Sequence, residues 1–118
     1  MKIAINKCYG GFGVSEKCAI KLREKGVKIA VPGEKYSDGT ICEKFYGNID
    51  NEEFGIEDDD YHKYRTDKRL IETIEEMGCK EASSDLAQIR IVDVPDNIKW
   101  FIDDYDGIES VHEEHNSW

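Results

Sequence analysis

A run of glycines between a predicted strand and a predicted helix is the feature of this sequence best suited to bind a ligand. Three glycines lie just ahead of Ser15, a residue that is well suited to cap a helix. Successive backbone N–H groups near the positive end of a helix bind phosphates and other anions. The predicted ligand-binding residues are those of the turn and one later arginine: Tyr9, Gly10, Gly11, Phe12, Gly13, Ser15 and Arg65.

Simpler interpretations of these residues stay open. The glycines form neither a Walker loop nor a complete G-x-G-x-x-G fingerprint, and they also suit a tight turn that needs positive φ. Arg65 stands just before a predicted helix cap at Thr66, where it could hold a phosphate or carboxylate. It could equally pair with the acidic stretch that precedes it. In the ligand-binding interpretation, Tyr9 and Phe12 stack on a planar base or ring.

The sequence contains no recognisable catalytic or metal-binding motif. It lacks G-x-S-x-G and H-E-x-x-H. His112 and His115 would point to opposite faces of a strand, and residues 58–60 lack the alternation and glycine of a calcium loop. Cys8 adjoins the glycine turn, but a buried cysteine at a strand end explains it as well. We predict a binding protein rather than an enzyme, with no cofactor and no metal; a small nucleotide-processing enzyme is a further alternative.

Length and composition predict one domain over residues 1–118. The 118 residues are 39% hydrophobic, which is enough for a core, and no apolar run is long enough to span a membrane. The N-terminus is too short and polar for a secretory signal, and the four cysteines form no C-x-x-C pair. We therefore expect reduced cysteines and a cytoplasmic location.

The charge of the chain is strongly negative and unevenly distributed. Residues 1–35 carry eight Lys or Arg against three acids, a net charge of +5, whereas the whole chain has a net charge of −10. Residues 48–60 contain seven acids and no base, and residues 101–118 contain six acids and no Lys or Arg. Such a chain repels nucleic acid but can attract a basic protein. An acidic surface that only maintains solubility is the simpler alternative.

Hydrophobic periodicity predicts an α+β fold with a mixed sheet, two main helices and a C-terminal hairpin. The predicted helices are residues 15–25 and 66–77, each followed by a terminating glycine. Strands are expected at residues 2–8, 27–31 and 87–94, in a hairpin over 98–113, and as a short piece at 41–46. The core is expected to include Leu22, Leu70, Ile74, Ile89, Ile91 and Trp100.

Three segments resemble a family of small uncharacterised proteins of bacteriophages and prophage-bearing bacteria. These are INKCYGGF at residues 5–12, YRTD at residues 64–67, and the run from Trp100 through YDGIE at residues 105–109. The chain departs from that family at Ser110, where a tryptophan is expected, and at Asn116 and Ser117, where an Arg-Thr pair usually precedes the final Trp118.

The resemblance implies an accessory protein that acts in the host cytoplasm, possesses no assigned activity, and counters host defence by binding and inhibition. Two binding functions fit: capture of a nucleotide-like ligand at the glycine turn, or mimicry of nucleic acid by an acidic surface that blocks a basic host protein, as some anti-CRISPR proteins do. The chain could also form a homo-oligomer, and no direct nucleic-acid or membrane binding is expected.

Overall fold

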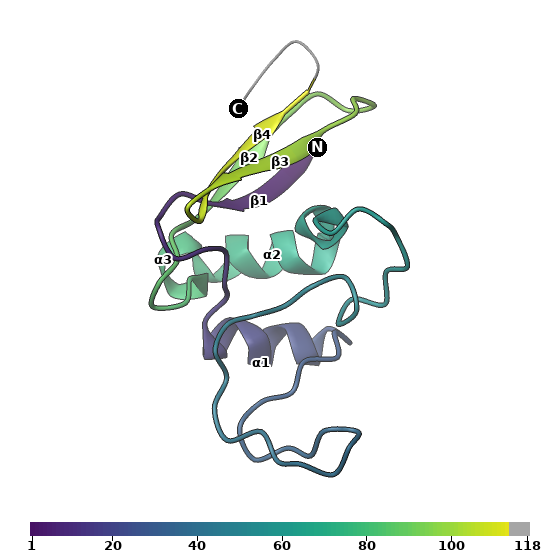
Figure 1. Cartoon of the computed structure of the whole chain (residues 1–118), viewed down its shortest axis with the longest axis vertical. Coiled ribbons are helices and arrows are strands. Elements are labelled where there is room, and N and C mark those ends of the chain that lie inside the picture. The colour runs from purple at the N-terminus through teal and green to yellow at the C-terminus, as the bar shows by residue number, and fades with distance from the viewer. Residues whose placement is uncertain (114–118) are drawn as a thin grey trace.

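The first strand of the chain, β1 (Lys2–Asn6), lies between two layers of the molecule in the computed structural model, which describes residues 1–113 (Figure 1). It pairs antiparallel with β2 (Ile89–Asp93), so that Ala4 lies opposite Ile91. Because successive side chains of a strand point to opposite faces, Ile3 and Ile5 pack in one cluster and Ala4 in another. The β1–β2 pair thus has apolar contacts on both faces.

A hairpin covers one face of this pair and helices cover the other (Figure 1). The hairpin consists of β3 (Phe101–Tyr105) and β4 (Ile108–His112), and its Ile102 and Val111 pack against Ile3 and Ile5. Its turn uses Asp106 and Gly107 with φ of 50° and 91°, the backbone form that matches the twist of two-residue hairpins. The predicted hairpin is therefore confirmed.

The helical layer consists of α1 (Glu16–Glu24), α2 (Lys68–Met77) and the short α3 (Cys79–Ala82). Ser15 caps α1 as predicted, since its side chain accepts a hydrogen bond from the N–H of Cys18. The cap of α2 is Asp67 and not Thr66, because Thr66 belongs to the preceding 3₁₀ turn η1 (Lys63–Thr66). Leu22, Leu70 and Ile74 are fully buried between these helices and the β1–β2 pair.

The α+β class is confirmed, but the strands form two antiparallel pairs and not one mixed sheet. Residues 27–31 are not a strand: the N–H of Val27 bonds to Leu22 and that of Lys28 bonds to Glu53. Val27 and Ile29 are nevertheless buried, so their alternation reflects packing of a loop on the helices. Residues 41–46 likewise form only an isolated bridge, between Ile41 and Lys35.

The expected core is largely correct. Ile89 is fully buried, whereas Ile91 and Trp100 are only partly buried at the margins of the two apolar clusters. Within residues 1–113, no helix has both the length and the apolar character needed to cross a membrane. Four residues named in the metal-site and resemblance arguments lie outside the described residues: His115, Asn116, Ser117 and Trp118.

Candidate functional site

The glycine turn packs against the turn of the C-terminal hairpin. Gly10 and Gly11 have positive φ of 120° and 87°, as the tight-turn interpretation requires. A Cβ atom placed on Gly107 would lie 2.4 Å from the backbone nitrogen of Gly11 and 2.7 Å from that of Gly10. The two glycine amides therefore lie directly against the backbone of the hairpin turn, and this contact leaves no room between them for a bound group.

The start of α1 is also engaged by other parts of the chain. The N–H of Val14 donates to the carbonyl of Gly47, and the N–H of Ser15 donates to the carbonyl of Ala82. The Ser15 hydroxyl donates to the carbonyl of Glu81 at 2.6 Å while it caps the helix. Ser15 thus joins α1 to α3, and its hydroxyl already has both a donor and an acceptor partner.

Arg65 is buried and holds the hairpin instead of facing solvent. Only 3% of the residue is exposed, and its two terminal nitrogens donate to the two carboxylate oxygens of Glu109 at 2.6 and 2.9 Å. The guanidinium also donates to the carbonyl of Ala4 and lies 3.7 Å above the centre of the Phe12 ring. Burial is the largest single influence on the pKa of Arg65 and acts to lower it, but the hydrogen bonds and charge interactions with Glu109 and Tyr64 together outweigh burial, so the pKa is raised.

Asn6 completes this buried polar cluster. Its backbone N–H donates to Glu109 at 2.8 Å, and its side chain donates to the carbonyl of Gly107 at 2.6 Å. The structure therefore brings Phe12 and Arg65 together, as a stacked pair, while Tyr9 stays 66% exposed at the surface. Sequence reasoning missed Glu109 as the partner of Arg65. The only available signal was that both residues fall within segments of the phage-protein resemblance.

A large cavity lies elsewhere, in the loop that the sequence left least defined. It has a volume of about 860 Å³ and is bounded by the end of α1 and by stretches within residues 26–37 and 44–53. Two hydrogen bonds hold these walls in place: the N–H of Lys28 donates to the carbonyl of Glu53, and the N–H of Gly33 donates to the carbonyl of Cys42. The volume falls within the range of small-molecule sites.

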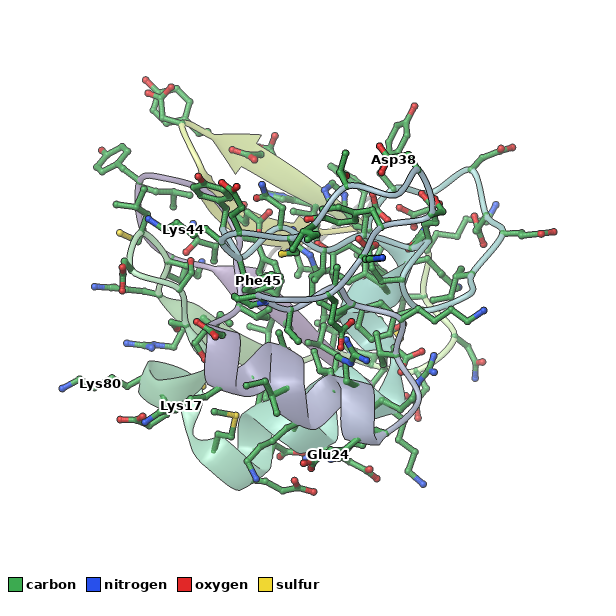
Figure 2. The ribbon with its side chains drawn as sticks, turned by 90° about the horizontal axis from the view of Figure 1, so that it is seen from below. Lys17, Glu24, Asp38, Lys44, Phe45 and Lys80 are labelled. Carbon is green, nitrogen blue, oxygen red and sulfur yellow. The ribbon has the colours of Figure 1, made fainter. Side chains whose placement is uncertain are left out.

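Cationic and aromatic side chains share the wall of this cavity. Three lysines and three aromatic residues line it: Lys28, Lys35, Lys44, Tyr36, Phe45 and Tyr46. Figure 2 looks at the loop side of the molecule and shows Lys44 and Phe45 on the loop, whereas Lys17 and Lys80 belong to the helical layer. Within residues 1–113, neither Lys28 nor Lys35 forms an ion pair.

Acidic side chains modify the charge of the cavity. Glu34 forms an ion pair with Arg23, so these two charges compensate each other. Burial, followed by a hydrogen bond that the protonated side chain donates to Asp50, raises the pKa of Glu53 to about 7. A side chain with this pKa is uncharged in a large fraction of molecules near neutral pH, so besides the Arg23–Glu34 pair the wall carries the charges of the three lysines and of Glu52.

The structure adds no metal or thiol site. Within the described residues, no group of three or more His, Cys, Asp or Glu side chains is placed to hold a metal ion. All four cysteines are free; Cys18 and Cys42 are buried, and Cys8 and Cys79 are partly buried. Burial raises the pKa of the Cys18 thiol to about 12, so this thiol is a weak nucleophile.

Comparisons with known proteins returned no relative: no family model, no curated protein and no solved structure matches the chain.

Proposed function

We propose that this chain is a binding protein that holds a small, planar, anionic ligand, such as a nucleotide, in the loop cavity. One observation carries the proposal: a cavity of about 860 Å³ whose wall combines Lys28, Lys35 and Lys44 with Tyr36, Phe45 and Tyr46. Lysines neutralise phosphate or carboxylate groups, and aromatic rings stack on a planar base. The rest of the chain is strongly acidic, which disfavours a long nucleic acid but not a small ligand.

The glycine turn is the weaker location for this ligand. Its amides lie against Gly107, and the guanidinium of Arg65 is paired with Glu109. An anion at the turn would have to displace the hairpin and separate a buried ion pair, which is costly. Within residues 1–113, by contrast, the cavity lysines form no ion pair, and Lys44 only lies over the ring of Tyr46 at 5.2 Å.

The biological setting that we propose follows from the resemblance to phage proteins. A phage accessory protein with such a cavity would act in the host cytoplasm as an inhibitor, by sequestering a nucleotide-like signalling molecule of a defence system. Binding alone is sufficient for this role, and no catalytic group is required.

Calorimetry with separate probes tests the proposal. The probes are nucleoside mono- and diphosphates, cyclic nucleotides, uncharged nucleosides and inorganic phosphate. At least one nucleotide should bind more tightly than both its nucleoside and phosphate alone, because lysines and rings act together. Absence of binding stronger than the millimolar range for every probe would refute the proposed function.

Matched variants locate the site. Lys44→Ala should weaken nucleotide binding about tenfold, since a hydrogen bond to a charged group contributes about 1.5–3 kcal/mol. Because Tyr46 is 73% exposed, Tyr46→Ala removes one aromatic ring from the cavity wall without loss of core packing. Lys17→Ala removes the same charge from an exposed position of α1 and should have no effect. If Phe12→Ala weakened binding in the folded protein and Lys44→Ala did not, the ligand would belong to the glycine turn.

A further inference from the structure

The outward face of the β3–β4 hairpin combines exposed aromatic rings with an exposed carboxylate. Phe101 and Tyr105 are 55% and 73% exposed, and Asp103 lies between them on the same face of β3. Across the hairpin, the residues that pair with these three are His112, Ser110 and Ile108. The opposite face is occupied, because Ile102 and Val111 pack against β1.

This face is well ordered by its own contacts. The rings of Phe101 and His112 stack with their centres 5.6 Å apart, and the Ser110 hydroxyl lies 2.7 Å from Nε2 of His112. The Arg65–Glu109 pair fixes the hairpin from below. A surface that is already ordered loses little conformational entropy when a partner binds.

The hairpin contains no Lys or Arg of its own, and Arg65 neutralises only its buried Glu109. Asp103, Asp104 and Asp106 are all exposed. The Asp103 side chain is 67% exposed, and one of its carboxylate oxygens lies 4.0 Å from Nε2 of His112. A partner that complements this face must therefore supply positive charge.

The acidic loop at residues 50–60 is less suited to the same partner. There, carboxylates are used within the loop: Asp58 accepts from the N–H of Asp60, and Asp60 accepts from the N–H of His62. On the hairpin, Asp104 has such a role as the acceptor for the N–H of Gly107, whereas Asp103 accepts no backbone hydrogen bond from residues 101–112. Asp103 combines an available carboxylate with two flanking rings, which is the combination that recognises arginine.

We propose that the outward face of the β3–β4 hairpin docks an arginine-rich segment of another protein. Phe101 and Tyr105 present ring faces to the guanidinium groups, and Asp103 accepts their hydrogen bonds. This inference is independent of the ligand cavity, which lies in a different part of the fold. It places the acidic surface that binds a basic partner on the hairpin and not on residues 48–60.

Amide NMR titration tests the proposal with a synthetic octapeptide of alternating Arg and Gly, against a Glu-Gly peptide as control. The Arg-Gly peptide should shift the amide signals of residues 101–112 in a saturable way. Asp103→Asn should weaken its binding about fivefold, and Tyr105→Ala should weaken it by a similar factor. The Glu-Gly peptide should leave the spectrum unchanged.

Matched controls separate docking from general charge attraction. Asp59→Asn removes the same charge, and Tyr61→Ala removes a ring that is 84% exposed on the acidic loop. Both changes should alter affinity less than twofold, and circular dichroism checks that every variant is folded. Equal weakening by Asp59→Asn and Asp103→Asn, or shifts that centre on residues 50–61, would overturn the assignment. Absence of saturable binding at low salt would do the same.

Discussion

The contact between β1 and the C-terminal hairpin differs in kind from the loop of residues 27–62. The first is closed by a buried ion pair, Arg65–Glu109, and by two apolar clusters that share the β1–β2 pair. The second is joined by scattered backbone hydrogen bonds and lines the cavity of about 860 Å³, although Val27, Ile29 and Phe54 anchor it in the core. The difference shows that the buried ion pair and the cavity lie in separate parts of this small chain.

The largest effect should come from breaking the ion pair. Glu109→Gln leaves the Arg65 charge buried without a carboxylate, and we expect a loss of about 3–5 kcal/mol in the free energy of unfolding. Urea denaturation measures it. The double variant Arg65→Met, Glu109→Leu should lose less than the single one, because no charge remains buried. If the double variant lost as much free energy of unfolding as Arg65→Met and Glu109→Leu lose in sum, the pair would not act as a unit.

Substitution of two glycines with similar φ tests how tightly each of the two regions is packed. Gly107 and Gly39 have φ of 91° and 88°, but a Cβ would meet the backbone of Gly10 and Gly11 only at Gly107. Gly107→Ala should therefore cost roughly 2–3 kcal/mol and Gly39→Ala about 1 kcal/mol, the cost of the left-handed backbone alone. Thermal and urea unfolding report both values. Equal losses would mean that the hairpin turn is not tightly packed on the glycine turn.

A smaller effect depends on pH and arises in the loop. Folding raises the pKa of Glu53 from 4.5 to about 7, so between these values the folded chain holds a proton that the unfolded chain lacks. The free energy of unfolding should consequently fall as pH rises through this interval, by roughly 1 kcal/mol after solvent screening. Glu53→Gln should remove this component of the slope, as urea titrations at pH 5 and pH 7.5 would reveal. An unchanged slope would contradict the raised pKa.

The smallest change is expected on the acidic loop. Glu57→Gln and Asp59→Asn replace exposed side chains, and we expect shifts within about 0.5 kcal/mol, since solvated like charges mainly repel one another. Denaturation at low and high salt would measure this. A loss above 1 kcal/mol would show that these two carboxylates support the loop.

Local sequence patterns predicted the helices and the hairpin because their determinants are close together in the chain. Leu70 and Ile74 recur at helical spacing, and Asp106-Gly107 suffices to define a two-residue turn. The strand predicted at residues 27–31 was wrong, because the alternation of Val27 and Ile29 indicates burial but does not identify a hydrogen-bond partner. The strands at 2–6 and 89–93 were recognised, but their pairing depends on contacts across most of the chain.

The candidate site was predicted less well, for the same reason. Ser15 was correctly placed as a cap, a role that depends on neighbours in sequence. Arg65 was assigned to an anion because of its position before a helix, whereas its actual partner is 44 residues further along the chain. The loop cavity assembles lysines and rings from several stretches without regular structure, and no periodic pattern marks such an arrangement.

The central position of β1 determines when this protein can finish folding. β1 is made first, yet Lys2 pairs with Asp93, and the Asn6 amide bonds to Glu109. During synthesis on the ribosome, β1 must therefore wait with its backbone unpaired and Ile3 and Ile5 uncovered until the last third of the chain has emerged. The helices depend on nearer contacts and can form earlier. Completion of this fold is thus a late event, and until then the uncovered apolar side chains and the unpaired strand favour aggregation.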